Sequence, residues 1–170
     1  TATAWDLNTF VDDFWGDYSL SQESNLAPPA YTYTLLRPTA DGTPTDWVCS
    51  TGTDNYANVD DVTPDDDTTY NYATAIDVVD EFTITDFSLP SGFVINSVIP
   101  VARVKKAGVT DAQIQLGLDQ GGTEEYATAQ SIATTYVYYF DRFTDDPTSA
   151  AWSDSNIDSI KLQIKSTGTF

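Results

Sequence analysis

Hydrophobic and polar residues alternate along much of this chain, in short segments that are separated by turn residues. In residues 31–37, YTYTLLR, aromatic and small polar residues alternate before an apolar pair. A period of two is typical of a strand that buries one of its faces. The same reasoning predicts further strands at residues 47–49, 69–76, 79–85, 93–106, 112–119, 125–134, 136–143 and 157–166.

Glycine, proline and aspartate mark the boundaries of these segments. We expect turns at Asp41-Gly42 and Thr51-Gly52 and in residues 89–92, 119–122 and 145–148, because these residue types favour hairpins and corners. Pro100 interrupts the longest segment, which predicts a bulge, an edge position or a change of sheet there. Ser153 is expected to cap a short helical turn before the last strand.

Short, regularly spaced strands in one chain predict an all-β fold, an antiparallel two-sheet β-sandwich that is jelly-roll-like. The length of 170 residues suits one domain, and the abundance of threonine, valine, isoleucine and aromatic residues favours strands over helices. Residues 1–30 lack this regularity and end in a polar stretch with two prolines. We therefore predict an N-terminal arm and linker at 1–30 and a sandwich domain at 31–170.

The expected arm contains several aromatic residues among acids. Phe10 and Phe14 are one helical turn apart, so this region is predicted to form a short helix or an extended arm. Aromatic side chains of this kind anchor protein interfaces when they are exposed. Packing against their own domain, as a cover for one sheet, is the alternative. The candidate interface residues are Trp5, Phe10, Phe14, Trp15 and Tyr18.

The charge of the chain limits its partners. With 26 acidic and 7 basic residues, the formal net charge is -19. Such a surface repels nucleic acid and anionic lipid, so neither is expected as a partner. No run of about 18 apolar residues is present, so no transmembrane helix is expected. The acids can serve solubility, recruit cations or complement a basic protein surface.

The residue types also argue against catalysis. The chain has no histidine, which removes the commonest acid-base group and most zinc and copper sites. Its single cysteine, Cys49, lies in an expected strand and is predicted to be a buried, inert thiol. Adjacent acids such as Asp80-Glu81 and Glu124-Glu125 resemble the paired carboxylates of glycoside hydrolases. Strand geometry sends neighbouring side chains to opposite faces, so we expect no enzymatic activity.

Two clusters are candidate binding sites. Five aspartates in one loop can supply oxygen ligands for Ca²⁺, although their spacing is not that of an EF-hand, and a solvated acidic loop is the alternative. The candidate ligands are Asp60, Asp61, Asp65, Asp66 and Asp67. A second cluster of aromatic residues can form a sugar-stacking face, the alternative being core packing. Its members are Tyr31, Tyr33, Tyr70, Tyr72, Tyr136, Tyr138, Tyr139 and Phe140.

An ordered series of residues carries a resemblance to a known family. Its first half comprises Leu36-Arg37-Pro38, Asp41-Gly42, Trp47, Thr51-Gly52, Tyr56, Val59-Asp60 and residues 66–70. Its second half comprises Phe82, Phe87, residues 89–92, 95–98 and 101–103, Asp146-Pro147, Trp152 and Ile157. Together they resemble a β-sandwich module of structural proteins in tailed bacteriophages, over residues 31–165.

The resemblance implies a non-enzymatic virion structural protein, either a capsid decoration protein or a tail or fibre accessory protein. Such a protein lies at the virion surface and works through contacts with capsid or tail proteins and with copies of itself, for example in a symmetric homo-oligomer. It needs no cofactor. Two rivals remain open: a secreted carbohydrate-binding or adhesive β-sandwich module, and a subunit of an extracellular filament assembled by strand donation.

Overall fold

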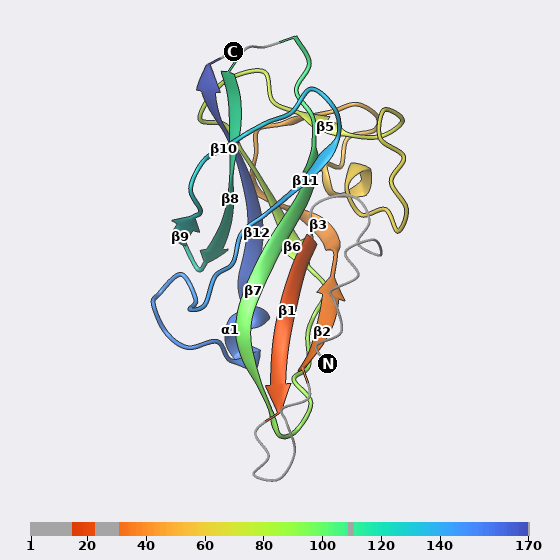
Figure 1. Ribbon diagram of the computed structural model, residues 1–170. Coiled ribbons are helices and arrows are strands. Elements are labelled where there is room, and N and C mark those ends of the chain that lie inside the picture. The colour runs from red at the N-terminus through yellow and green to blue at the C-terminus, as the bar shows by residue number, and fades with distance from the viewer. Residues whose placement is uncertain (1–14, 23–30, 109–110, 170) are drawn as a thin grey trace, which may run out of the picture.

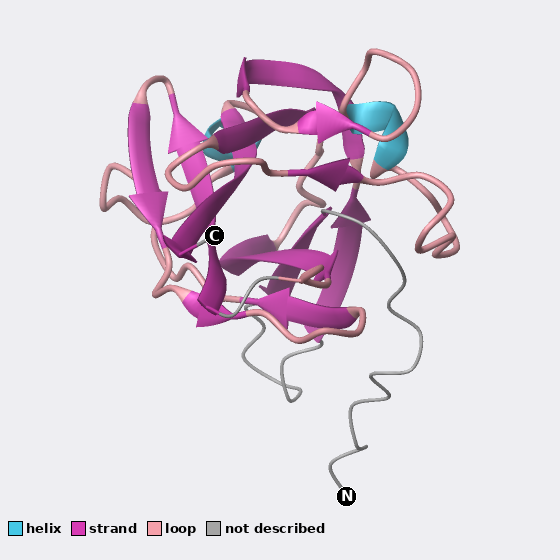
Figure 2. Ribbon diagram, turned by 90° about the horizontal axis from the view of Figure 1, so that it is seen from above, coloured by secondary structure: helices cyan, strands magenta, loops and turns pink. Residues whose placement is uncertain are grey.

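The computed structural model describes residues 15–22, 31–108 and 111–169, which form an all-β sandwich of antiparallel sheets (Figure 1). Strands make up nearly all of its regular structure, with two short helical segments between them (Figure 2). The predicted fold class is confirmed in this form. The finer description, a jelly roll, stays a prediction.

One sheet has four strands in the order β11-β7-β1-β2. Its strands are β1 (Trp15–Gln22), β2 (Tyr31–Leu36), β7 (Phe93–Val104) and β11 (Val137–Phe140). Every neighbouring pair runs antiparallel. Strands β2 and β11 therefore form the two edges of this sheet.

The second sheet has six strands, in the order β10-β8-β12-β6-β3, with β9 also pairing with β8. Its strands are β3 (Pro38–Thr45), β6 (Val79–Ile84), β8 (Asp111–Gln120), β9 (Thr123–Tyr126), β10 (Gln130–Ser131) and β12 (Ile160–Thr169). A third, two-stranded sheet joins β4 (Val48–Cys49) to β5 (Asn71–Tyr72). The helical segments are the 3₁₀ turn η2 (Tyr56–Asn58) and α1 (Asp154–Ile157).

Alternation along the strands builds the core between the two larger sheets. In β12, Leu162 and Ile164 are buried in the hydrophobic core, whereas Lys161 and Lys165 reach acidic partners outside it. Phe82 on β6 and Val98 on β7 are also completely or almost completely buried in this core. Burial of a large apolar side chain of this kind stabilises the fold by roughly 1.5–3 kcal/mol.

Strand β1 is the main difference from the predicted organisation. It lies between β7 and β2, with Trp15 opposite Val101 and Gly16 opposite Leu36. The sandwich therefore includes residues 15–22, which the sequence analysis assigned to the N-terminal arm. The expected helix around Phe10 and Phe14 falls on residues 1–14, outside the described residues.

Several local predictions can be compared with the structure. The cap is confirmed, because the Ser153 hydroxyl accepts a hydrogen bond from the backbone N–H of Asn156 at the start of α1. The turn expected at Asp41-Gly42 is wrong, since both residues lie within β3, where the register against β6 is irregular. The single strand expected at 125–134 is two short strands, β9 and β10.

Pro100 does not move β7 to another sheet. Its lack of an N–H coincides with the end of the regular pairing between β7 and β11, at Val101 opposite Phe140. Beyond it, the Asp141 N–H still donates to the Pro100 carbonyl (3.4 Å), and an isolated bridge joins Val98 to Phe143. The strand thus stays in the four-stranded sheet and loses only part of one ladder.

Candidate functional site

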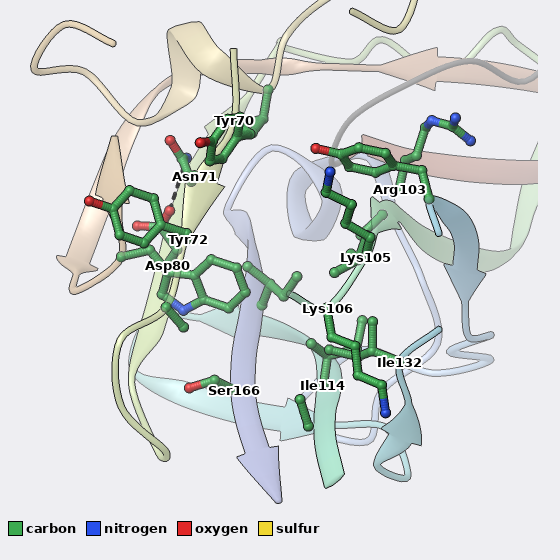
Figure 3. Close-up of a pocket in the computed structure, with 18 of the residues that line it drawn as sticks. Tyr70, Asn71, Tyr72, Asp80, Arg103, Lys105, Lys106, Ile114, Ile132 and Ser166 are labelled. Carbon is green, nitrogen blue, oxygen red and sulfur yellow. Dashed lines mark hydrogen bonds between the residues drawn. The ribbon is translucent and has the colours of Figure 1, made fainter. Parts of the chain in front are cut away.

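A pocket of about 490 Å³ opens at one end of the sandwich. It lies where β7 ends and where the two-stranded β4–β5 sheet meets the six-stranded sheet (Figure 3). Its volume lies within the usual range for small-molecule sites. The floor is apolar, with Phe82, Ile114 and Ile164 from the core of the six-stranded sheet. Aromatic side chains line one wall, and residues at the end of β7 line the other.

The aromatic wall consists of Trp47, Tyr70 and Tyr72. The ring centroids of Tyr70 and Tyr72 are 6.1 Å apart, with their planes tilted by 54°. These two tyrosines are 38% and 42% exposed, respectively, so both can contact a ligand. The Trp47 indole N–H donates to the Val78 carbonyl (3.2 Å), which fixes the ring against the start of β6.

Backbone hydrogen bonds hold this wall in place. Val48 pairs with Tyr72 and Cys49 with Asn71 in the small sheet. Beside it, the Tyr70 N–H donates to the Ser50 hydroxyl (2.8 Å), and the Ser50 N–H donates back to the Tyr70 carbonyl (2.8 Å). The wall is therefore formed before any ligand arrives, which limits the entropy that binding must overcome.

Asp80 lies behind the aromatic wall and is completely buried. Its two carboxylate oxygens accept hydrogen bonds from the Asn55 side-chain amide at 2.7 and 2.9 Å. The Asn71 amide donates to the same carboxylate at 3.1 Å and to the Asn55 carbonyl at 2.9 Å. One buried carboxylate thus connects β6 to the loop before η2 and to β5.

Burial shifts the protonation of Asp80. The pKa of its carboxylate is raised from 3.8 to about 7, chiefly by removal from water, and the charges of Asp41 and Asp46 contribute in the same direction. The hydrogen bonds from Asn55 and Asn71 act in the opposite direction. Asp80 therefore titrates near neutral pH.

Cys49 is part of the same network. Its thiol lies 2.5 Å from the side-chain oxygen of Asn55, to which it donates. Desolvation, followed by the charges of Asp41 and Asp80, raises the pKa of this thiol. A protonated thiol is a weak nucleophile, which agrees with the inert role expected for Cys49.

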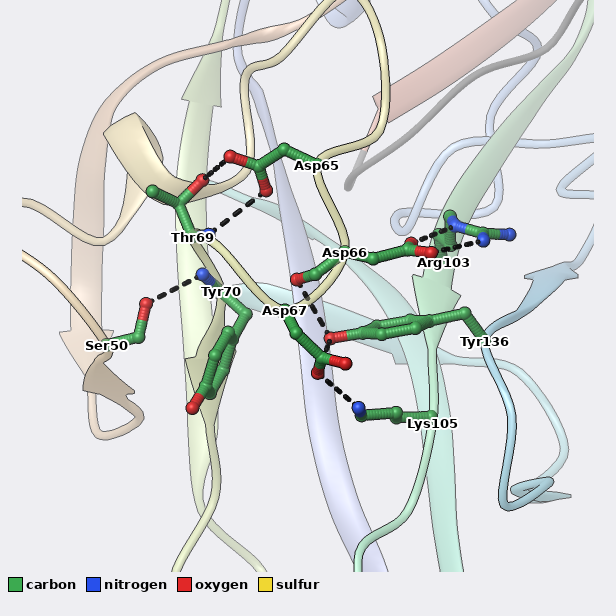
Figure 4. A network of polar contacts seen from close by, with 9 residues as sticks. All are labelled: Ser50, Asp65, Asp66, Asp67, Thr69, Tyr70, Arg103, Lys105 and Tyr136. Carbon is green, nitrogen blue, oxygen red and sulfur yellow. Dashed lines mark hydrogen bonds and ion pairs between the residues drawn. The ribbon is translucent and has the colours of Figure 1, made fainter.

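The acidic loop separates into two groups (Figure 4). Asp65 accepts hydrogen bonds from both the N–H (3.0 Å) and the hydroxyl (2.8 Å) of Thr69, and this hydroxyl also lies 3.4 Å from Asp61. Burial, followed by the charges of Asp65 and Asp60, raises the pKa of Asp61. Asp61 and Asp65 thus share a single hydroxyl group and repel each other there, and Asp60 adds to the repulsion on Asp61.

Asp66 and Asp67 instead form ion pairs with the end of β7. Arg103 donates to both oxygens of Asp66, at 2.7 and 3.0 Å. These bonds hold the pKa of Asp66 below its usual range. Lys105 pairs with Asp67, and the Tyr136 hydroxyl donates to the Asp66 carbonyl at 2.9 Å.

Tyr136 also lies under both cations of this contact. The Arg103 guanidinium is 5.3 Å and the Lys105 ammonium 4.6 Å from its ring centroid, within the range of cation–π attraction. Burial, together with the adjacent Asp67, raises the pKa of Tyr136, so its hydroxyl stays a donor at neutral pH. These contacts hold the acidic loop against Arg103, Lys105 and Tyr136, at the edge of the pocket.

These contacts bear on the predicted Ca²⁺ site. Asp66 and Asp67 are engaged by cations, whereas Asp61 and Asp65 converge on Thr69. Within residues 15–22, 31–108 and 111–169, no group of three or more histidine, cysteine, aspartate or glutamate residues could hold a metal ion. Asp66 and Asp67 therefore serve as ion-pair residues of the loop, and a Ca²⁺ site at the five aspartates stays a prediction.

The aromatic cluster predicted as a sugar-stacking face does not lie on one face. Tyr70, Tyr72 and Tyr136 line the pocket. Tyr139 is buried, and its hydroxyl accepts a hydrogen bond from the Ala133 N–H at 2.7 Å. Tyr33 (55% exposed) and Phe140 (58% exposed) lie on the two edge strands of the four-stranded sheet.

The other aromatic residues named from the sequence lie at different places in the structure. Tyr138 packs 5.1 Å from the Arg103 guanidinium. Trp47, which the sequence analysis did not place in the cluster, completes the pocket wall. Of the candidate interface residues, Trp5, Phe10 and Phe14 lie outside the described residues, and Trp15 and Tyr18 lie on β1.

The adjacent acids at 80 and 81 point in opposite directions, as strand geometry requires. Glu81 accepts hydrogen bonds from Lys161 (2.7 Å), Gln163 (2.8 Å) and the Thr43 N–H (2.8 Å) on the outer face of the sheet. A Cβ atom at Gly42 would lie 2.5 Å from Glu81, so glycine is required above this buried carboxylate. Asp80 and Glu81 thus belong to two separate hydrogen-bond networks on opposite faces of β6.

Asp41 and Asp146 belong to the series of residues that carries the family resemblance, and each holds a loop through hydrogen bonds to backbone N–H groups. Both oxygens of Asp41 accept backbone N–H groups at the start of η2, from Asn55 (3.1 Å) and Tyr56 (2.6 Å). Asp146 accepts from the N–H groups of Thr148 (2.9 Å) and Ala150 (2.9 Å). Although burial raises its pKa, these hydrogen bonds outweigh that effect and hold the pKa of Asp146 below its ordinary value.

Comparison with protein-family models, with curated proteins and with solved structures gave no match for this chain. Within the described part of the chain, no helix has the length and apolar character needed to cross a membrane.

Proposed function

We propose that this chain is a non-enzymatic structural protein of a tailed-bacteriophage virion, either a capsid decoration protein or a tail or fibre accessory protein. It lies at the virion surface and works through contacts with capsid or tail proteins and with copies of itself. The proposal begins from the resemblance carried by residues 31–165, and the contacts of those residues supply its physical support.

The observation that carries the proposal is the use of the resembling polar residues as braces between loops and strands. Arg37 donates to the Asp61 carbonyl, Asp66 pairs with Arg103, and Asp146 closes its own loop. Asp41 fixes the start of η2 through two backbone N–H groups. Long loops held in this way suit a rigid module that must keep its shape within a large assembly.

Exposed apolar side chains on edge strands supply surfaces for protein contacts. Tyr33 lies on β2, whereas Val137 and Phe140 lie on β11, and all three are more than 40% exposed. Aromatic residues at such positions are typical interface anchors, and the free backbone groups of an edge can pair with a strand of another chain. Trp5, Phe10 and Phe14 remain predicted attachment residues.

The test is to purify the particles made by cells that encode this chain, on a density gradient, and to identify their proteins by mass spectrometry. The proposal expects the chain in the particle fraction in a fixed ratio to the major capsid or tail protein. Phe140→Asp is expected to weaken this association, whereas Asp141→Asn next to it serves as a control. Recovery of the chain only among free proteins would refute the proposal.

Assembly of a filament by strand donation is a second candidate, and the position of β1 favours it. This first strand of the sandwich fills a slot between β7 and β2, and it could fill the same slot in a neighbouring copy. The purified protein would then polymerise alone in a concentration-dependent manner, as measured by light scattering. A stable monomer or closed oligomer supports the virion proposal instead.

A further inference from the structure

We propose that the pocket at the end of the sandwich, bounded by Trp47, Tyr70, Tyr72, Asp67 and Lys105, is a binding site for a neutral sugar unit of a glycan. This activity is separate from attachment to a virion and could occur in a protein of either proposed function. The shape of the pocket, its charge and the ordering of its wall in the absence of a ligand support this assignment.

The aromatic wall offers an apolar surface that is both exposed and fixed. Tyr70 and Tyr72 are two residues apart around β5, so their side chains lie on the same side, and the tilt of 54° between the rings makes a corner instead of a flat platform. Trp47 also lines the pocket and adds an indole ring to its apolar surface. The C–H face of a sugar ring fits against such aromatic surfaces, while its hydroxyl groups reach the polar rim.

The rim opposite the tyrosines supplies strong hydrogen-bonding groups. The side chain of Asp67 is 71% exposed, and it is paired with the Lys105 ammonium. Together they present acceptors and donors at one edge of an apolar cavity. Vicinal hydroxyl groups, which both donate and accept, match this combination.

The charges that line the pocket favour a neutral ligand. Asp66 is paired with Arg103 and Asp67 with Lys105, so these four charges at the pocket cancel, and the buried Asp80 and Lys106 are the other ionisable residues of the lining. The whole chain carries -19, so an anionic polymer is repelled as it approaches. A neutral polar ligand experiences neither a local charge excess nor long-range repulsion.

A purely apolar occupant, such as a leucine or phenylalanine side chain of another protein, fits less well. It would cover the Asp67–Lys105 pair without replacing the water that now solvates these charges, which is costly. A sugar replaces that water with hydroxyl groups. The buried wall groups need no ligand, because Asp80 and Asn71 already satisfy each other and Asn55.

The experiment titrates the complete chain, by isothermal calorimetry and saturation-transfer NMR, with methyl glycosides of glucose, galactose, mannose, N-acetylglucosamine and N-acetylgalactosamine. Glucuronic acid is the anionic comparison. We expect at least one neutral glycoside to bind with a Kd of about 1 mM, the affinity of a small ligand with few contacts. Glucuronic acid should bind at least tenfold more weakly than that glycoside.

Two variants locate the binding to this pocket. Tyr72→Ala removes half of the aromatic corner, and Asp67→Asn changes the exposed acceptor while keeping its size; each should raise the Kd at least fivefold. Tyr33→Ala, at a tyrosine on β2 that is 55% exposed against 42% for Tyr72, is the control and should leave the Kd unchanged. Circular dichroism of each variant distinguishes a lost site from a lost fold.

Failure of all five glycosides to bind below 50 mM overturns the inference. Unchanged binding in both folded pocket variants, or tighter binding of glucuronic acid, overturns it as well. None of these outcomes affects the virion proposal, which is tested by the composition of the particle.

Discussion

Replacing the buried acid Asp80 with asparagine is expected to remove a specific part of the pH dependence of folding. Asp80 is completely buried, and its carboxylate accepts hydrogen bonds from the side-chain amides of Asn55 and Asn71. Its pKa is raised from 3.8 to about 7, chiefly by burial. The folded protein therefore holds a proton on Asp80 in a pH range where the unfolded chain has lost it.

The sign and size of the effect follow from this difference. Because the folded state binds more protons between pH 3.8 and about 7, its stability falls as pH rises through that range and is constant above it. Each pH unit contributes about 1.4 kcal/mol, which gives roughly 4 kcal/mol for the full range. Between pH 5 and pH 8 the contribution is about 3 kcal/mol.

The assay is urea unfolding at pH 5, 6, 7 and 8, followed by tryptophan fluorescence, to which Trp47 beside the network contributes. The free energy of unfolding of the wild type minus that of Asp80→Asn should fall by about 3 kcal/mol from pH 5 to pH 8. Taking this difference cancels the titration of the other acids. Asp77→Asn is the matched control, since the Asp77 side chain is 68% exposed and pairs with Lys165.

The reasoning is refuted if the free energy of unfolding of the wild type minus that of Asp80→Asn stays constant within about 1 kcal/mol from pH 5 to pH 8. Such a result would mean that the hydrogen bonds from the two asparagines offset the cost of burying the charge. An equally large pH effect in Asp77→Asn would also contradict the assignment to Asp80.

Three further predictions concern the body of the sandwich. Phe82→Ala, at a site that is 1% exposed, should lower the free energy of unfolding by about 3–5 kcal/mol in urea titrations, and a loss below 1 kcal/mol would contradict its place in the core. Arg103→Met should cost about 1 kcal/mol, because the ion pair with Asp66 is partly exposed, and should speed proteolytic cleavage in residues 60–69; an unchanged cleavage rate argues against the brace. Removal of residues 1–22 should abolish the cooperative unfolding transition seen by circular dichroism, since it takes β1 from the middle of its sheet, whereas removal of residues 1–14 should preserve it; equal behaviour of the two shortened chains would contradict this.

The strands with clear alternation could be predicted from the sequence, because local pattern and burial agree there. In β12, apolar residues such as Leu162 face the core, and lysines occupy the other face. Strand β7 was found for the same reason, despite Pro100. The resemblance to a β-sandwich module of phage proteins likewise depends on the order and spacing of residues, which can be read directly from the sequence.

Strands β1 and β3 were missed because tertiary contacts determine them. Residues 38–45 contain two prolines and a glycine, which disfavour strands, yet Gly42 is needed where β3 passes over the buried Glu81. Strand β1 has only a short alternation, at Tyr18 and Leu20 after Gly16 and Asp17, and it lies between β2 and β7, the latter about eighty residues away along the chain. Neither partner can be identified from the local sequence.

The pocket was only partly foreseeable. The spacing of Tyr70 and Tyr72 places both on one face of a strand, and the sequence analysis included them in an aromatic cluster. That cluster also included Tyr136, which lines the pocket with them, whereas Trp47 was not included and joins them only through folding. The aspartates suggested Ca²⁺ because Arg103 and Lys105, their partners for Asp66 and Asp67, lie almost forty residues further along the chain.

The central claim, a structural protein at the virion surface, is tested most directly by electron cryomicroscopy of the native particle. The account predicts repeated density at fixed positions on the capsid or tail into which the two-sheet sandwich fits, with β2 or β11 at a protein contact. A complete set of particle proteins resolved without this sandwich would contradict it.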